Sequence, residues 1–194
     1  GCGTCHPNNG RVDGLNWDLL NDGMGNPKSN KSMLLAWKTP PMMARAVRES
    51  FEVCVRAGFR FIEFAVPPEE NVQATMAYLR DLKPESSPYL DSNRKLTPPA
   101  QRGKKLFDGK AQCAKCHPGP LFTDKKQYDV GTKANDDTDE NGIYDTPTLI
   151  EGYRTGPYLH DGRAVTMREV LTECNKLDKH GKTTKLSKQE LDDL

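Results

Sequence analysis

Apolar residues recur at helical spacing in only a few stretches of this chain, and long polar segments separate these stretches. In the clearest one, residues 69–82, Val72, Met76 and Leu79 fall at positions i, i+4 and i+7 and form one apolar stripe. A second helix is predicted over residues 42–57, because a glycine follows as a typical C-terminal residue. No segment shows the alternation of a convincing strand. The pattern therefore predicts a mainly α fold with long irregular loops.

Capping residues predict three further helices. Thr97-Pro98 is typical of an N-cap followed by a first-turn proline, and it predicts a helix that runs through Phe107. Thr166-x-x-Glu169 is a capping box for a helix through about Asn175, and Ser187-x-x-Glu190 is another at the end of the chain.

Residues 84–96 are rich in proline, serine and charge, which predicts a linker between two domains, residues 1–88 and 89–194. No strong repeat relates the two parts, so we expect them to be divergent. We also expect the first domain to be truncated at its N-terminus and the second at its C-terminus. Long loops are predicted over residues 7–40 and 118–164, with a polar surface loop at 135–141.

The composition narrows the class of protein. Hydrophobic residues make up 35% of the chain, a low share that favours a core completed by a large apolar cofactor. The net charge of +1 argues against a nucleic-acid partner. No run of about 18 apolar residues occurs, so no membrane span is predicted in this sequence.

Two Cys-x-x-Cys-His motifs identify the cofactor. Two thiols at this spacing add to the two vinyl groups of one porphyrin, and the adjacent histidine binds the iron from the proximal side. The first motif has Cys2, Cys5 and His6, and the second motif has Cys113, Cys116 and His117. The sequence thus predicts two c-type cytochrome domains with one covalently bound haem c each. Because such attachment takes place outside the bacterial cytoplasm, a periplasmic or extracellular location is expected.

Few residues remain as candidates for the distal ligands of the two haem irons. The chain has four histidines, and His160 and His180 are the two outside the motifs. The first domain has no second histidine, which favours an open distal face on its haem. A methionine is the alternative ligand there: Met24, Met33, Met42, Met43 or Met76. The second haem has Met167, Cys174 and His160 as candidates for its sixth ligand. Cys54 and Cys174 either form a disulfide or stay as separate thiols.

Several segments of the second domain resemble the bacterial di-haem cytochrome c peroxidases, a family that includes the di-haem enzyme that matures methylamine dehydrogenase. The resemblance covers residues 98–194 strongly and 1–97 more weakly. Its segments are Arg102-Gly103-Lys104-Lys105-Leu106-Phe107, Gly119-Pro120-Leu121-Phe122-Thr123-Asp124, Thr146-Pro147-Thr148-Leu149, Thr155-Gly156-Pro157-Tyr158-Leu159-His160-Asp161-Gly162 and Thr166-Met167-Arg168-Glu169-Val170-Leu171, with Asn30-Lys31-Ser32-Met33-Leu34-Leu35 in the first domain.

The resemblance implies roles for residues of both domains. A calcium ion between the haems would be bound by Asn30, Thr155 and Pro157, an oxygen ligand set that suits a hard cation. His160 would lie near the haem propionates. Cys174 stands at the family's position for the distal ligand of the second haem, and a thiolate there would lower the reduction potential of that haem.

The first domain departs from the family. The removable distal histidine is missing, and the segment with the inter-haem tryptophan has become Met43-Ala44-Arg45-Ala46-Val47. The family's distal acid, a proton donor in O–O cleavage, corresponds most closely to Glu63, with Arg60 beside it.

Taken together, these features predict a cytochrome c peroxidase-like enzyme. Electrons would pass through the second haem to the first, where hydrogen peroxide is reduced, and a small cytochrome or cupredoxin would be the donor. The alternative is a non-catalytic di-haem electron-transfer module of a larger secreted or multihaem assembly, in a homo- or hetero-oligomer.

Overall fold

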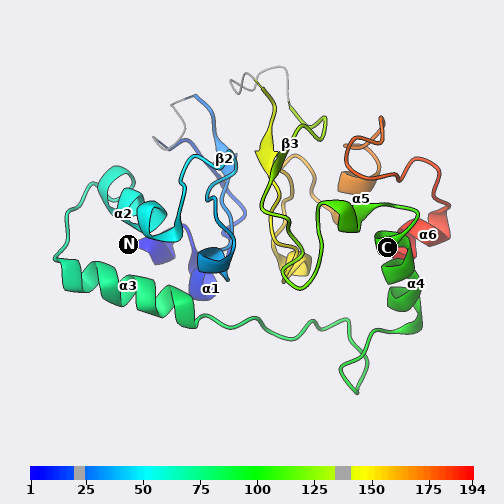
Figure 1. The fold of residues 1–194 in the computed structure, drawn as a ribbon, viewed down its shortest axis with the longest axis horizontal. Coiled ribbons are helices and arrows are strands. Elements are labelled where there is room, and N and C mark those ends of the chain that lie inside the picture. Colours follow the sequence, from blue (N-terminus) through cyan, green and yellow to red (C-terminus); the bar gives the residue numbers. More distant parts are fainter. Residues whose placement is uncertain (20–24, 134–140) are drawn as a thin grey trace.

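The computed structural model describes residues 1–19, 25–133 and 141–194. Met24 and most of the predicted loop at 135–141 lie outside these ranges. Figure 1 shows two groups of helices, one at each side of the molecule, joined by a long extended segment that follows α3 (Glu69–Asp81) and leads into α4 (Pro98–Asp108). Within the described ranges no helix is both long and apolar enough to span a membrane.

Regular structure is sparse, and it is mainly helical as predicted. The remaining helices are α1 (Pro7–Gly10), α2 (Phe51–Phe61), α5 (Met167–Leu171) and α6 (Lys188–Asp193). Two antiparallel pairs of short strands occur, β1 (Asn16–Trp17) with β2 (Lys28–Ser29) and β3 (Gln127–Tyr128) with β4 (Tyr144–Asp145). Most of the described backbone outside the helices is loop.

The first group of helices has a small apolar core. The predicted stripe of α3 is buried, and Met76 is only 1% exposed. It packs against Phe51 of α2 and against the segment around Leu34. Met76 is one of the methionines considered as haem ligands. Its side chain fills this core, so it has a role in packing.

The second group is held by a close crossing of α4 and α6 at Gly103. A Cβ atom on Gly103 would lie 1.9 Å from the carbonyl oxygen of Asp193, so the two backbones are in contact. Thr97 and Ser187 cap the two helices as predicted, with their hydroxyl oxygens accepting from Ala100 and Glu190 backbone N–H groups.

The predicted helix over residues 42–57 is wrong in its first half. Met42 and Arg48 form a β-bridge, and Met43 and Ala46 have positive φ, so the chain turns back on itself there. The helix starts only after Ser50, whose hydroxyl oxygen accepts from the Val53 N–H. The helix from Thr166 has its predicted capping box but ends at Leu171.

A backbone repeat that is not evident in the sequence relates the two predicted domains, residues 1–88 and 89–194, which are called the first and second domain below. Each feature in the first domain has a counterpart 116 residues later, and the first matched positions are Leu35 and Glu151. The matching features are positive φ at Leu35, Met43 and Ala46 and at Glu151, Leu159 and Gly162; the 3-10 turns η2 (Ala36–Lys38) and η4 (Gly152–Arg154); the bridges Met42–Arg48 and Tyr158–Ala164; and the N-caps Ser50 and Thr166. Over residues 35–50 only Thr39 and Pro41 are identical to their counterparts, which explains why the sequence pattern does not reveal it.

A buried ion pair joins the domains. The Arg11 guanidinium donates two hydrogen bonds to the Glu151 carboxylate, at 3.0 and 2.9 Å, and the side chains are 6% and 2% exposed. Arg154 and the Glu85 N–H also donate to this carboxylate. Burial alone would raise the pKa of Glu151, but these hydrogen bonds lower it to about 2.

Further contacts extend the interface from this pair. The Asp145 N–H donates to the Ala44 carbonyl oxygen at 2.8 Å, and Lys31 pairs with the Asp145 carboxylate at 3.3 Å. Burial raises the pKa of Asp145 to about 6, although Lys31 acts in the opposite direction. The two halves therefore meet through polar contacts, among which the pair of Arg11 and Glu151 is almost fully buried.

The close crossing of α4 and α6 gives a stability prediction. Replacing Gly103 by alanine forces the helices apart, so we expect a loss of about 1–3 kcal/mol in the free energy of unfolding. A Cβ atom added to Gly58 in α2 would meet no atom within 4 Å, and Gly58→Ala should be stabilising by about 0.5–1 kcal/mol. Denaturant unfolding of the haem-loaded variants would measure both. Equal effects at the two sites would contradict the described crossing.

The buried ion pair gives a second prediction. Arg11→Met leaves a buried carboxylate short of a partner, and the expected loss is about 3 kcal/mol in the free energy of unfolding. Arg56 is the matched control, because its pair with Glu69 is exposed and Arg56→Met should change little.

The pH dependence of the same pair has a defined sign. The folded-state pKa of Glu151 lies below its ordinary value of 4.5, so its ionisation adds stability above about pH 4.5 that is lost as the pH falls towards 2. The stability difference between wild type and Glu151→Gln should shrink over this range. A pH-independent difference would show that the ion pair is not its source.

Candidate functional site

The second motif lies in the 3-10 turn η3 (Cys113–Lys115) and the residues that follow it. His117 is 8% exposed, and its Nδ1 donates to the carbonyl oxygen of Phe122 at 2.9 Å. This bond leaves Nε2 as the nitrogen available to a metal and fixes the ring. Burial lowers the pKa of His117, which favours the neutral imidazole that a metal requires.

His180 faces His117. The centroids of the two rings are 6.3 Å apart, and the ring planes are inclined at 40°. Because an imidazole nitrogen binds a transition metal at about 2 Å, this separation fits one metal ion held between two imidazoles. Burial and the neighbouring His117 lower the pKa of His180 to about 4, so this ring too is neutral. The pair thus has the chemistry of a haem site with two histidine ligands.

Asn175 holds the loop that carries His180. Its side chain, 2% exposed, donates to the carbonyl oxygens of His180 and Gly181 and to the Thr183 hydroxyl, and it accepts from the His180 N–H at 2.8 Å. The loop also packs onto the second motif. Gly181 has a φ of +78°, and a Cβ there would lie 2.9 Å from the Ala111 carbonyl oxygen and 3.7 Å from Cys113 Sγ.

The three residues expected as the sixth ligand lie elsewhere. Cys174 lines a cavity of about 320 Å³ with Arg163 and Lys179. Met167 is the first residue of α5 and is 39% exposed. The His160 ring stacks on the Tyr144 ring, with centroids 3.9 Å apart. Cys54 and Cys174, both in the described part of the chain, do not form a disulfide.

The first motif has a different environment. Burial lowers the pKa of His6, its proximal histidine. Cys2 Sγ lies 3.2 Å from the Glu63 carboxylate, so Glu63, the expected distal acid, lies beside the motif. The guanidinium of Arg60 instead lies over the Phe61 ring, 5.4 Å from its centroid, on the exposed end of α2.

Four further sulfur-containing residues of the first half are described. Cys54 lies 3.8 Å from the Met43 sulfur, and burial raises the pKa of its thiol to about 11. Met33 and Met42 pack against the apolar core. Met33 and Met42 thus contribute to packing, and the sequence supplies no second histidine in residues 1–88.

The segments that carry the residues expected to bind calcium lie close together. Asn30 Oδ1 accepts from the Asp13 N–H at 3.3 Å, and its amide donates to the Cys5 carbonyl oxygen. A Cβ on the neighbouring Gly14 would lie 3.5 Å from the ring of Pro157 and 3.8 Å from the Gly156 carbonyl oxygen. The Asn30 segment and the 155–157 turn are thus close. Among described residues no group of three or more His, Cys, Asp or Glu side chains forms a metal site.

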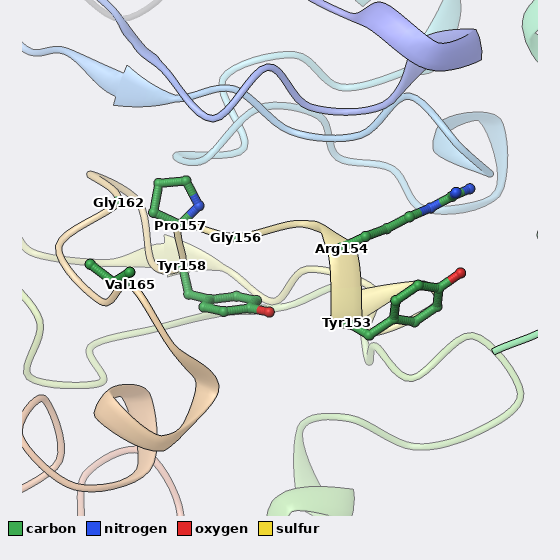
Figure 2. Close-up of a pocket in the computed structure, with 7 residues that line it drawn as sticks. All are labelled: Tyr153, Arg154, Gly156, Pro157, Tyr158, Gly162 and Val165. Atoms are coloured by element: carbon green, nitrogen blue, oxygen red, sulfur yellow. The ribbon is translucent and has the colours of Figure 1, made fainter. Parts of the chain in front are cut away.

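A cavity of about 600 Å³ opens beside this turn (Figure 2). Figure 2 shows Tyr153 and Arg154 extending from η4 and the Tyr158 ring extending from the segment that follows it. Val165, on the same wall, is 71% exposed, so the cavity carries apolar surface that a bound group could cover.

Sequence reasoning missed His180 as a candidate for the sixth ligand. Two features of the sequence could have indicated it: it is one of two histidines outside the motifs, and a glycine follows it. The resemblance to the peroxidase family instead put Cys174, six residues earlier, at the position of the sixth ligand. The intervening turn, built on Asn175, brings His180 instead to the face of His117.

Curated proteins of three kinds resemble this chain. It is 31% identical to hydrazine synthase subunit gamma of Kuenenia stuttgartiensis over 100% of this chain and 69% of that protein. It is 39% identical to methylamine utilization protein MauG of Methylorubrum extorquens over 37% of this chain and 24% of that protein. It is 30% identical to cytochrome-c peroxidase IdrP1 of Denitromonas iodatirespirans over 39% of this chain and 31% of that protein. No family model matches the chain.

Solved structures share the whole fold. Hydrazine synthase of Kuenenia stuttgartiensis, solved under xenon, superposes with a TM-score of 0.86 and 28% identity over 100% of this chain and 78% of that one. A MauG-like protein associated with microbial copper homeostasis has a TM-score of 0.72 over 100% of this chain and 79% of that one, and its 19% identity shows the fold alone.

The chain is therefore a haem-binding, peroxidase-like oxidoreductase of the di-haem cytochrome c peroxidase and MauG class, as the sequence predicted. Within this class it belongs to the family of hydrazine synthase subunit gamma.

Asn175 gives a prediction for the site. Asn175→Ala removes four hydrogen bonds from a buried position, so His180 should move from the face of His117 and the free energy of unfolding should fall by about 1–3 kcal/mol. The visible spectrum of the second haem would report the lost ligand. Asn93, exposed on the linker, is the control. If the spectrum is unchanged in Asn175→Ala, Asn175 does not position His180.

Proposed function

We propose that this chain is a di-haem cytochrome in which the second haem transfers electrons and the first haem reacts with a small oxidised substrate, hydrogen peroxide in the first instance. The observation that carries the proposal is the unequal supply of ligands. His117 and His180 face each other at 6.3 Å, whereas His6 has no second histidine in its domain. An iron with both axial positions filled carries electrons, and one with an open position can bind a substrate.

The proposed binding groups follow the two motifs. Cys2 and Cys5 would anchor the first haem and His6 would bind its iron. Cys113, Cys116 and His117 would do the same for the second, with His180, rather than Cys174, as the sixth ligand. Bound haem would supply the redox chemistry, in which two electrons and two protons convert peroxide to water. Two neutral imidazoles on the second iron support a role in electron transfer.

Glu63 is the residue of this chain proposed to handle protons near the first haem. Its carboxylate lies 3.2 Å from Cys2 Sγ, next to an anchoring position of the porphyrin. A carboxylate so placed can donate or accept a proton at bound peroxide. Arg60 is not assigned this role, because its guanidinium stacks on Phe61.

A calcium site, a role for His160, an electron donor and a location are also proposed, on the basis of the family resemblance and of contacts at the interface. The meeting of the Asn30 segment with the 155–157 turn supports calcium binding by Asn30, Thr155 and Pro157. His160, buried at the same interface, is proposed to lie near a haem propionate. A small cytochrome or cupredoxin is the proposed electron donor, and the periplasm or the exterior the proposed location.

A second candidate function is that of a haem subunit in an assembly of the hydrazine synthase type. The likeness that favours it covers 100% of this chain, whereas the likeness to cytochrome-c peroxidase IdrP1 covers 39%. The chain would then be expected to act with partner subunits and to reduce peroxide slowly when alone.

The ligand assignment is tested with His180→Ala and Cys174→Ser in the haem-loaded chain. His180→Ala should convert the second haem from low-spin to high-spin, because it loses a strong-field imidazole. Cys174→Ser should leave the spectrum unchanged. The reverse outcome would assign the sixth position to Cys174.

The reaction is tested by peroxide turnover with a reduced small cytochrome as donor. Glu63→Gln should lower the rate on the order of 10²-fold, the range that a positioned general acid contributes. Turnover no faster than free haem in the wild type would exclude the peroxidase function for the isolated chain and favour the subunit role.

A further inference from the structure

The carboxylate of Asp145 is buried at the contact between the two domains, and it is only partly satisfied there. Its side chain is 10% exposed. Lys31 Nζ donates to Oδ2 at 3.3 Å, whereas among the described residues no group donates a hydrogen bond to Oδ1. Burying a charge is costly unless the charge is paired and its remaining lone pairs are hydrogen-bonded. The ionised form of Asp145 is therefore poorly suited to this position.

The other buried carboxylate at this contact, that of Glu151, is better satisfied. It accepts hydrogen bonds from two arginines and a backbone N–H, and these hold its pKa low against burial. Lys31, in contrast, is 36% exposed and reaches only one oxygen of Asp145. A cation that water also solvates offsets little of the cost of burial. Burial therefore raises the pKa of Asp145 to about 6, even though Lys31 acts in the opposite direction.

A second carboxylate near Asp145 adds to this effect. After burial and Lys31, the negative charge of Asp124 is the remaining influence on the pKa of Asp145, and it raises that pKa. Partial burial would raise the pKa of Asp124 itself, but the Tyr128 hydroxyl donates to it at 2.6 Å and helps to hold it low, so Asp124 stays ionised. Among the described residues, the segments that pack against β4 also carry these charged or titratable side chains: Arg45, Lys126, Tyr128 and His160.

Asp145 is joined to segments on both sides of the contact. Its N–H donates to the Ala44 carbonyl oxygen of the first domain at 2.8 Å. Its partner Lys31 follows Asn30, whose amide donates to the carbonyl oxygen of Cys5 in the first motif. A change in the charge of Asp145 therefore acts directly on the contact between the two domains.

We propose that Asp145 is a pH-sensitive element of the contact between the two domains. While the carboxyl group carries a proton the contact is closed. When the carboxyl O–H bond breaks and the proton passes to water, the contact opens locally and the hydrogen bond to Ala44 is lost. The pair of Arg11 and Glu151 keeps the domains associated in the open state. This inference requires no reaction at either haem site, so it can fail without the proposed function failing, and the reverse.

The direction of the pH dependence is defined. The folded-state pKa of Asp145 lies above its ordinary value of 3.8, so the folded state binds this proton more tightly than an open or unfolded state does. The contribution of Asp145 to stability is fully present below about pH 4 and is lost as the pH rises through about 6. Glu151 has the opposite dependence, because its contribution is lost as the pH falls.

The test is amide hydrogen exchange of the full haem-loaded chain, followed by mass spectrometry in peptides that contain Asp145. At each pH the wild type is compared with Asp145→Asn, which has no charge to bury. The ratio of wild-type to variant exchange should rise on the order of tenfold from about pH 4.5 to about pH 7.5. Lys31→Met removes the opposing cation and should enlarge the rise. Asp81→Asn, at an exposed carboxylate on α3, is the control and should exchange as the wild type does.

Two results would overturn the proposal. One is a ratio that does not change with pH. The other is faster exchange in Asp145→Asn than in the wild type at about pH 7.5, since Asp145 and Lys31 would then be an ordinary stabilising ion pair. Peptides from α4 and α6 separate local opening from global unfolding: they should show no rise, and an equal rise there would also contradict local opening. If Asp145→Asn does not load haem, the wild type is compared with Lys31→Met, and an equal rise in the two overturns the proposal.

Discussion

The buried pair of Arg11 and Glu151 is the constraint on which the arrangement of this molecule depends. The two haem motifs lie in different domains, and an extended linker alone would not fix their separation. Burying two charges is costly, and here hydrogen bonds from Arg154 and the Glu85 N–H help to offset that cost. Glu151 begins the repeat of the second domain, so the same contact also positions the 155–161 segment against the first domain.

The repeat makes the difference between the two halves interpretable. One backbone pattern serves both, yet the buried His160 of the second domain corresponds to Ala44 in the first. The second domain adds a loop held by Asn175 that presents His180 to His117, and the first domain instead brings Glu63 to Cys2. A common scaffold thus supports one site at which two imidazoles face each other and one at which a carboxylate lies beside a motif cysteine. The division of labour that we propose between the haems rests on these local differences.

Local signals in the sequence predicted where several helices begin. Contacts between residues far apart in the chain could not be predicted in this way. Thr97, Thr166 and Ser187 cap helices because an N-cap needs only its own next three residues. The helix predicted from residue 42 was wrong in its first half because apolar residues 42–47 suit a helix by composition, while positive φ at Met43 and Ala46 is imposed by the fold. The pairing of Arg11 with Glu151, and the approach of His180 to His117, depend on contacts that no periodicity encodes.

The two iron sites proposed for this protein differ, with two histidines at one and a single histidine at the other. Electron paramagnetic resonance of the oxidised, haem-loaded wild type is the decisive experiment, since it reports both irons in one spectrum. We expect one low-spin ferric signal typical of two imidazole ligands and one high-spin ferric signal. Two low-spin signals, or a low-spin signal typical of thiolate ligation, would contradict it.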